Sequence, residues 1–155
     1  MASLRFGRVD GPMGPMWVAE TDAGVAAASH ADSPQPMLAE LGRRFPGVTP
    51  VADAVDDAWP VTGVSPPLDL SGLSSFDARV YQVVRTVAPG QTVTYGEVAA
   101  LIGSPGAARA VGGAMARCPL FPAVPCHRVV RAADGWSGWG GDVRLKRRLL
   151  EAERR

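Results

Sequence analysis

The pattern of apolar residues changes character at about residue 72, and this change limits the folds that the chain can adopt. Between residues 4 and 29, short apolar runs are separated by the turn-forming segments Asp10-Gly11-Pro12 and Asp22-Ala23-Gly24. Such spacing is typical of a small antiparallel meander. After residue 72 the apolar positions recur at helical spacing instead. Strands and helices are therefore expected to be segregated along the chain, as in the α+β class.

The rest of the first part predicts one short helix and a long loop. Apolar residues from Met37 to Phe45 are spaced as in a helix. Residues 46–67 are rich in Pro, Val and Asp and predict a loop with one strand around Val61. Turn-forming residues up to Gly72 then mark a boundary, so we expect two domains, 1–72 and 73–155.

The second part predicts three helices before residue 118. The first is amphipathic and ends before Pro89-Gly90, with apolar positions at Phe76, Val80, Val83, Val84 and Val87. Thr94 and Glu97 have capping-box spacing at the start of the second, whose expected buried side is Val98, Leu101 and Ile102. A turn at Gly103–Gly106 leads into a third helix, Ala107 to Arg117. Two helices joined by a short turn that contains glycine predict a helix-turn-helix.

The third expected helix is unusual because its side chains are small. The small residues on its face are Ala107, Ala108, Ala110, Gly112, Gly113 and Ala114. Such residues add little to a core, so another surface is expected to approach this helix closely. A groove of DNA and a neighbouring helix fit equally well at this point. Arg109 is the only charge in the first two turns.

Charge is distributed unevenly between the two parts. Residues 1–72 have a net charge of −5 and residues 73–155 have +6. A basic second part suggests a polyanionic partner, although a solvated helical face would give the same count. No apolar stretch approaches the length of a membrane helix, and residues 1–15 do not resemble a secretory signal. With only two cysteines, eight positions apart, a reducing cytoplasm is the expected location.

The segment Val124–Val130 contains the strongest candidate for chemistry. Cys126 is flanked by Pro125 and His127, and Arg128 follows. Thiolates are strong nucleophiles, and a nearby imidazole or positive charge raises the thiolate fraction. Adjacent side chains do not face each other in a regular helix or strand. Activation of Cys126 by His127 therefore requires an irregular backbone or a bridging water, whereas the alternative is a buried structural cysteine.

Two later features can contribute to the same site. Residues 135–141 contain glycines and two tryptophans, which can grip a planar base or simply fill the core. The chain ends in a basic helix over residues 143–155, with Leu145, Leu149 and Leu150 on one side. Glu153 falls one turn beyond Leu149 on that side. An inward-facing carboxylate needs a partner, and His127 is the expected one.

Six motifs then follow in a fixed order: Thr94-Tyr95-Gly96, Gly103-Ser104-Pro105, Ala107-Ala108-Arg109-Ala110-Val111-Gly112, Pro125-Cys126-His127-Arg128-Val129, Gly140-Gly141, and Leu149-Leu150 followed by Glu153. In this order and spacing they resemble the O6-alkylguanine-DNA alkyltransferase family. The resemblance is dense over residues 73–155 and thin over 1–72, which would correspond to a supporting α/β (RNase H-like) domain.

The resemblance implies a DNA repair protein that acts once. It would transfer an alkyl group from O6-alkylguanine, with O4-alkylthymine as a further candidate substrate, irreversibly to Cys126. His127 would be the water-mediated base, Glu153 would orient the imidazole, and Tyr95 would hydrogen-bond the base and protonate the departing guanine. The second helix of the helix-turn-helix would enter the minor groove of double-stranded DNA, and Arg109 would fill the space left by the flipped base.

The same resemblance implies further site residues and partners. The implied DNA-binding residues are Arg109, Gly96, Ser104, Ala107, Ala110 and Arg128, and the implied substrate pocket is formed by Met115, Val129, Trp139 and Gly140. No cofactor is implied. Some family members hold zinc through cysteines in the first domain, but here no cysteine precedes Cys118, so no metal site is expected. The protein would be monomeric in solution, able to cluster on DNA, and associated with the nucleoid.

Two residues depart from the family pattern, and two rival functions can be weighed against the resemblance. Cys118 stands where the family usually has Asn, and Trp139 stands where Tyr is usual. One rival function is a non-catalytic lesion sensor of the alkyltransferase-like kind, but such proteins lack the cysteine that Cys126 provides. A second is a Cys-His hydrolase, which would leave the DNA-binding pattern without a purpose.

Overall fold

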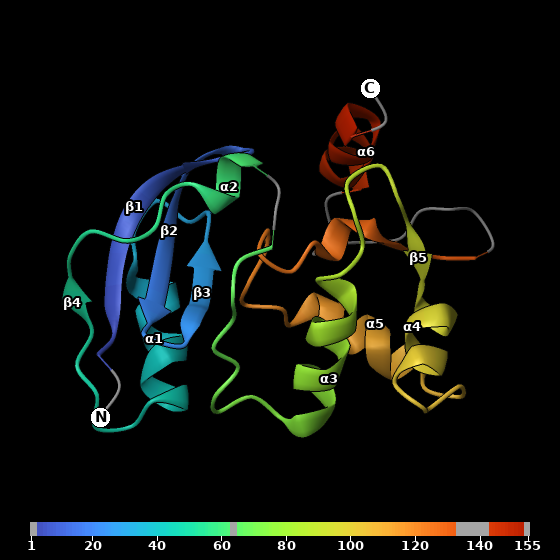
Figure 1. Cartoon of the computed structure of the whole chain (residues 1–155), viewed down its shortest axis with the longest axis horizontal. Helices are drawn as coiled ribbons and strands as arrows, with labels where there is room; N and C mark the ends of the chain where they lie inside the picture. Colours follow the sequence, from blue (N-terminus) through green and yellow to red (C-terminus); the bar gives the residue numbers. More distant parts are fainter. Residues whose placement is uncertain (1–2, 63–64, 133–142, 154–155) are drawn as a thin grey trace. The chain divides into compact units, whose positions relative to one another are not determined.

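The computed structural model of the protein describes residues 3–62, 65–132 and 143–153, and the chain divides into two compact units (Figure 1). Unit 1 comprises Met1–Leu73 and Pro119–Ala123, and unit 2 comprises Ser74–Cys118 and Val124–Arg155. The segment Pro119–Ala123 departs from the division expected from the sequence. It belongs to unit 1 because the amide of Ala28 donates a 2.8 Å hydrogen bond to the carbonyl of Pro119.

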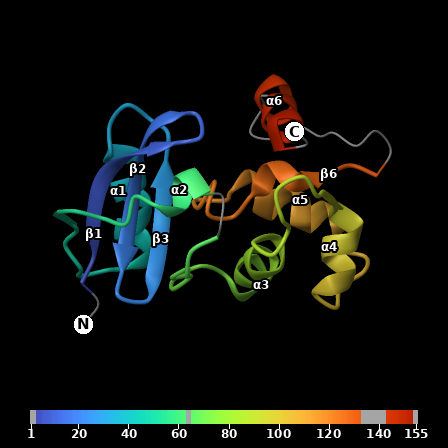
Figure 2. The ribbon, with the colours of Figure 1, turned by 45° about the horizontal axis from the view of Figure 1, so that its top comes forward.

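Unit 1 is built on an antiparallel meander, as the spacing of the apolar runs predicts. Its strands are β1 (Arg5–Gly11), β2 (Gly14–Thr21) and β3 (Gly24–Ser29), and the sheet order is β3-β2-β1-β4. Helix α1 (Gln35–Arg44) packs against this sheet (Figures 1 and 2). The core between them is formed by Leu4, Ala19, Ala26, Ala27, Met37, Leu41 and Phe45.

The strand expected around Val61 is wrong. That position belongs to the short helix α2 (Trp59–Thr62), and the extra strand is β4 (Val51–Ala52), which runs parallel to β1. Val51 is exposed and lacks the alternation of a half-buried strand. It is placed by backbone hydrogen bonds to β1 instead, with the Val51 amide 2.9 Å from the carbonyl of Leu4.

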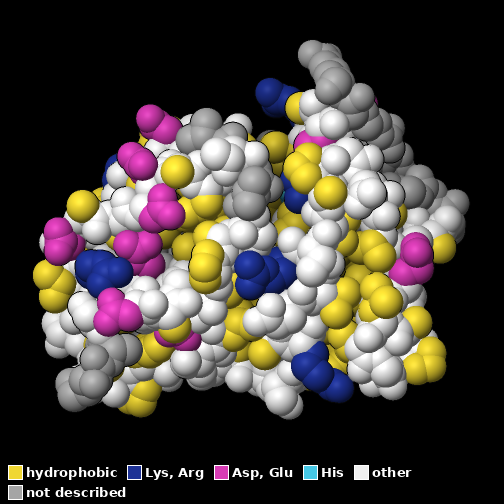
Figure 3. All heavy atoms as spheres, in the orientation of Figure 1, with side chains coloured by type: hydrophobic (Ala, Val, Ile, Leu, Met, Phe, Trp, Pro, Cys, Tyr) yellow, Lys and Arg dark blue, Asp and Glu magenta, His cyan; other side chains and the backbone are white. Residues whose placement is uncertain are grey.

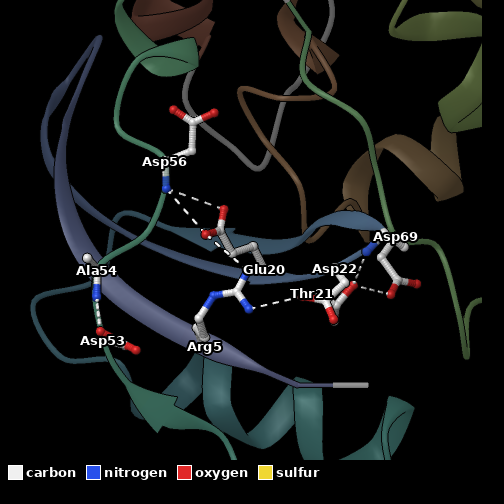
Figure 4. Close-up of polar contacts among 9 residues, drawn as sticks. Arg5, Glu20, Thr21, Asp22, Asp53, Ala54, Asp56 and Asp69 are labelled. Atoms are coloured by element: carbon white, nitrogen blue, oxygen red, sulfur yellow. Dashed lines mark hydrogen bonds and ion pairs between the residues drawn. The ribbon is translucent and has the colours of Figure 1, made fainter. Parts of the chain in front are cut away.

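Polar contacts join distant segments of unit 1 (Figure 4). Arg5 forms ion pairs with Glu20 at 3.5 Å and with Asp22 at 3.3 Å. The buried Thr21 hydroxyl donates to Asp69 at 2.6 Å. Burial alone would raise the pKa of Asp69, but hydrogen bonds from Ser71 and Thr21 outweigh it, so the pKa is lowered. The bond between Thr21 and Asp69 thus joins the segment around Asp69 to strand β2.

The α-helices in the described part of unit 2 are α3 (Ser75–Val84), α4 (Tyr95–Leu101), α5 (Ala108–Ala116) and α6 (Val143–Glu153). The expected capping box of α4 is present, because the Thr94 hydroxyl accepts from the Glu97 amide and the Glu97 carboxylate accepts from the Thr94 amide, each at 3.0 Å. Short strands β5 (Val93–Thr94) and β6 (Val129–Val130) pair in parallel. Among the described residues, no helix is long and apolar enough to cross a membrane.

The expected burial of Leu101 is wrong, since this side chain is 68% exposed. Helix α4 packs against α3 and α5 through Val98, Ala99 and Ile102 instead. At about 100° per residue, Leu101 lies roughly 100° from the centre of that face. The buried face is therefore rotated by about 50° from the one we expected.

Candidate active site

Cys126 lies at the start of η1 (Cys126–Arg128), a single 3-10 turn that leads directly into β6. The Cys126 amide donates to the carbonyl of Val124 at 2.8 Å, and its Sγ donates to the same carbonyl at 3.3 Å. The turn is the irregular backbone that activation of a cysteine by the next residue requires. Pro125 precedes it, and its fixed φ suits such a bend.

The Cys126 thiol is held in its protonated form by its surroundings. The side chain is 1% exposed, and this burial raises the pKa of the thiol well above its usual value. A hydrogen bond with the side chain of Cys118 acts in the same direction, while the positive charge of Lys146 lowers the pKa. A base must therefore remove the proton during a reaction, because the resting sulfur is not a thiolate.

His127 and Glu153 form the acid–base pair that the sequence predicts. The Nε2 atom of His127 lies 2.6 Å from Oε1 of Glu153. Burial lowers the pKa of His127, against the opposing effect of Glu153, so the imidazole is neutral at pH 7. Burial would raise the pKa of Glu153, but the hydrogen bonds from His127 and Arg128 bring it down to about 2. A neutral base is thus held beside a permanent carboxylate.

The structure corrects the assignment of Arg128 to the DNA-binding residues. Its side chain is buried inside unit 2. Its Nε lies 2.9 Å from Oε2 of Glu153 and its Nη2 lies 2.7 Å from Oε1. A third contact, 2.9 Å, joins Nη1 to the carbonyl of Val87. This bidentate pair orients the carboxylate, so Arg128 positions Glu153 rather than facing a DNA backbone.

Lys146 is a site residue that the sequence reasoning missed. Its side chain is 0% exposed, its Nζ donates to the carbonyl of Val129 at 2.5 Å, and Nζ lies 5.9 Å from the centre of the Tyr95 ring. Its charge lowers the pKa of both Cys126 and His127. The signal was available, because Lys146 precedes Leu149 and Leu150 by three and four residues and therefore shares their inward face.

Tyr95 is the first residue of α4 and is half-buried in unit 2. The backbone of Gly112 on α5 passes close to it, since a Cβ added at Gly112 would lie 3.9 Å from Cε1 of the Tyr95 ring. Pairing of β5 with β6 connects the start of α4 to the segment that follows η1. Two further pocket candidates, Met115 and Val129, are buried in the core of unit 2. Trp139 and Gly140 lie outside the described residues.

The small residues of α5 leave part of that helix open to solvent. Arg109 and Ala110 are exposed, and Ala107 and Gly112 are half-buried. Of the other residues assigned to DNA binding, Gly96 at the start of α4 is exposed and Ser104 in the turn between α4 and α5 is half-buried. Helices α4 and α5 pack against each other across this short turn, and the exposed side chains of α5 are small apart from Arg109.

Unit 1 carries many acidic residues on its surface. Acidic side chains gather over unit 1 on the face in Figure 3. They include the exposed Asp22, Asp53, Asp56 and Asp57. The charge asymmetry of the sequence is thus present on the surface, and unit 1 has the wrong charge for a phosphate backbone.

Comparisons with known proteins agree with this geometry. The family model of the 6-O-methylguanine DNA methyltransferase DNA-binding domain matches residues 75–155. A methylated-DNA--protein-cysteine methyltransferase of Mycolicibacterium paratuberculosis is 49% identical over 88 residues, which cover 57% of this chain and 53% of that protein. The regulatory protein ada of Salmonella typhimurium is 35% identical over 164 residues, covering 97% of this chain and 46% of that protein. The chain thus spans about half the length of the curated relatives it matches.

Solved structures match nearly the whole chain. The crystal structure of Mycobacterium tuberculosis OGT in complex with DNA has a TM-score of 0.73 and 30% identity, covering 97% of this chain and 92% of that one. An O6-methylguanine-DNA methyltransferase from Pyrococcus kodakaraensis has a TM-score of 0.68 and 27% identity, covering 97% and 98%.

Proposed function

The chain belongs to the 6-O-methylguanine DNA methyltransferase family, and we propose that it repairs alkylated DNA by moving an alkyl group from O6 of guanine irreversibly to Cys126. The observation that supports this most is the 2.6 Å contact between His127 and Glu153 directly after a buried thiol in a 3-10 turn. A nucleophile, a neutral base and an orienting carboxylate are the parts that thiol alkylation needs.

The first chemical step is loss of the thiol proton. With Nε2 of His127 bonded to Glu153, Nδ1 is the nitrogen that would receive the proton through a bridging water. Glu153 stabilises the imidazolium that forms, and Arg128 holds the carboxylate in place. The buried ammonium of Lys146 favours the sulfur anion.

The second step is displacement at the saturated carbon of the alkyl group. The sulfur–carbon bond forms as the carbon–oxygen bond breaks, and the electron pair goes to the guanine oxygen. A poor leaving group of this kind departs more readily when a proton arrives, which is the role of Tyr95 as a general acid. The product is a thioether without a hydrolytic exit. Each molecule therefore acts once, and the reaction uses no cofactor.

DNA would be bound through the helix-turn-helix. The exposed, small-faced side of α5 fits a narrow groove, and we assign the minor groove as the binding surface. Because the Cys126 sulfur is buried, the alkylated nucleotide must leave the base stack to reach it, at an energy of a few kcal/mol that a spoiled base pair reduces. Arg109, exposed on α5, would fill the vacated space. The solved relative described as a complex with DNA supports the binding of DNA.

Intact-mass spectrometry tests the proposal. After incubation with a duplex containing O6-methylguanine, the protein should gain one methyl group, and Cys126→Ser should gain none. Cys118→Ser is the matched control and should still gain the methyl group. A protein that binds the duplex without a mass change would be a lesion sensor instead, and a duplex with O4-methylthymine tests the second substrate in the same way.

A further inference from the structure

A tight turn between α3 and β5 lies against the end of α6. The Gln91 amide donates to the carbonyl of Ala88 at 3.0 Å, and Gly90 between them has a φ of +85°. Proline at the second position and glycine with a positive φ at the third are typical of a type II turn. Figure 1 shows this turn, residues 88–91, beside α6 within unit 2.

Gly90 brings the backbone of this turn close to the residue that orients the base. A Cβ added at Gly90 would lie 3.2 Å from the backbone carbonyl oxygen of Glu153, which is shorter than an ordinary van der Waals contact. A side chain at this position would therefore push the turn and the end of α6 apart. The position requires glycine for two reasons, the positive φ and the close approach of another backbone.

The same connection also holds Arg128. Its Nη1 donates to the carbonyl of Val87, one residue before the turn, at 2.9 Å. The Nε and Nη2 atoms of the same guanidinium bind Oε2 and Oε1 of Glu153 at 2.9 and 2.7 Å. Both partners of this ion pair are thus contacted by the segment 87–91, the cation through its side chain and the anion through its backbone.

Glu153 needs support from outside its own helix. It is the last residue of α6, and the carbonyl groups in the last turn of a helix have no partner within the helix. Helix ends fray when nothing else holds them. The 2.6 Å contact between its Oε1 and Nε2 of His127 requires a fixed carboxylate nevertheless. The segment 87–91 supplies a contact on the backbone side that α6 itself lacks.

We propose that Gly90 is a positioning residue of the candidate active site, because it allows the segment 87–91 to hold Glu153 and Arg128 where the carboxylate orients His127. All of these contacts lie within unit 2. The positioning of Glu153 does not depend on which reaction the site performs, whereas its consequence for alkyl transfer rests on the proposed function.

The titration of His127 reports the position of Glu153 without any alkyl transfer. Burial is the main cause that lowers the pKa of His127, and the charges of Arg128 and Lys146 act in the same direction, whereas Glu153 raises it. Displacement of the carboxylate should therefore lower the pKa of His127 further. The chain has two histidines, so an NMR titration shows two imidazoles, and His30→Gln identifies the signal of His127.

Gly90→Ala and Gly47→Ala separate the contact from the backbone strain. The two glycines have similar φ values, +85° and +81°, but a Cβ added at Gly47 would meet no described atom within 4 Å beyond its own chain neighbours. Both variants should lose stability to a similar extent, which thermal unfolding measures. Only Gly90→Ala should lower the pKa of His127. The same shift in Gly47→Ala would assign the effect to strain and overturn the proposal.

Gly90→Asn keeps the test decisive if Gly90→Ala does not fold. Asparagine adopts a positive φ more readily than alanine does, but its Cβ would lie in the same place. This variant should keep more of the native melting temperature than Gly90→Ala and should still lower the pKa of His127. A native titration of His127 in both Gly90 variants would overturn the proposal.

Single-turnover kinetics with a saturating O6-methylguanine duplex connect the position of Glu153 to the reaction. Gly90→Ala should slow alkyl transfer by roughly tenfold, because a misplacement of about 1 Å can cost about 100-fold and the displacement here is smaller. The Kd for the duplex should not change, because Gly90 lies outside α4 and α5. Gly47→Ala should match the native protein in both measurements. A weaker Kd with a native transfer rate would contradict a positioning role.

The same variants separate the two levels of the account. A lowered pKa of His127 in Gly90→Ala, in a protein that never accepts an alkyl group, would support the positioning role and refute the proposed function. A protein that accepts the alkyl group at the native rate in both Gly90 variants, with a native titration of His127, would refute the positioning role alone.

Discussion

Glu153 is the residue that connects the base His127 to the buried cation Arg128 in the candidate active site. Its two oxygens accept from His127 and from the buried guanidinium of Arg128. The first contact sets the orientation of the base, and the second keeps the carboxylate ionised down to low pH. Removing the charge would affect both functions at once, since Arg128 would be left as a buried cation without its anion.

Glu153→Gln should slow alkyl transfer by about 100-fold, the scale of a lost general-base contribution. It should also lower the melting temperature, because the Arg128 charge is no longer compensated. Rapid-quench kinetics and thermal unfolding measure the two effects. The matched control is Glu151→Gln, an exposed glutamate on the same helix, which should change neither. An unchanged rate in Glu153→Gln would remove Glu153 from the mechanism.

Lys146 should control the pH at which the sulfur reacts. Its charge lowers the pKa of Cys126, so Lys146→Met should raise that pKa. The alkaline rise of the rate should then move to higher pH. Reaction with the free O6-alkylguanine base removes DNA binding from the measurement, and the exposed Arg148→Met serves as the control. A profile that does not move would mean that Lys146 acts only in packing.

Two errors at the residue scale have different causes. The sequence contains Arg128 beside a cysteine in a basic half of the chain, which favours a DNA contact. Its true partner, Glu153, lies 25 residues further on. Lys146 was overlooked because lysine is almost never fully buried. The pairing of Arg128 depends on a tertiary contact, whereas the partnership of His127 with Glu153 could be predicted from the inward face of α6, which Lys146 shares.

At the scale of elements, helix α5 is the surface through which we propose that the protein meets DNA. Its exposed positions are small, so a large side chain there would hold the DNA away without disturbing the core. Arg109 on the same helix is assigned a different role, in filling the stack after the base has left. The two roles predict different responses to substitution.

Ala110→Leu should weaken binding to undamaged duplex DNA by at least tenfold, or ~1.4 kcal/mol. The larger leucine side chain would prevent the DNA groove from approaching the backbone of α5. Fluorescence anisotropy measures the affinity, and melting temperature should be unchanged because the site is exposed. The control is Ala23→Leu, the same change at an exposed turn of unit 1. Equal affinity of Ala110→Leu and the native protein would place DNA elsewhere.

Most elements could be predicted from the sequence because their periodicity is strong. The meander, α1 and the capped α4 agree with the structure. The strand β4 has two exposed residues and is placed only by pairing with β1, so no pattern of burial marks it. Leu101 shows the related limit: an apolar residue at helical spacing can lie at the edge of the buried face.

For the whole molecule, the site connects chemistry to stability through pH. Glu153 has its pKa lowered from 4.5 to about 2, and burial lowers that of His127 below its usual 6.5. In both cases the unfolded chain binds protons at a higher pH than the folded chain does. The stability from Glu153 is therefore complete above about pH 4.5 and lost as the pH falls toward 2, and that from His127 declines below about pH 6.5.

The free energy of unfolding should thus fall as the pH decreases from 7 to 4, and more steeply below 4.5 as the unfolded form of Glu153 takes up its proton. Urea unfolding at a series of pH values measures the slope. Glu153→Gln should flatten the curve below pH 4.5, while Glu151→Gln should follow the native protein. A native curve that is flat across this range would contradict the pKa shifts.

The central claim is that one sulfur atom takes one alkyl group and keeps it. A duplex with an isotopically labelled methyl group on O6 of guanine, supplied in large excess, measures this directly by label counting and peptide mapping. The account predicts one label per chain, located on Cys126 in the peptide of residues 118–128 and stable on prolonged incubation. Repeated turnover, loss of the label with time, or a label on any other residue would contradict it.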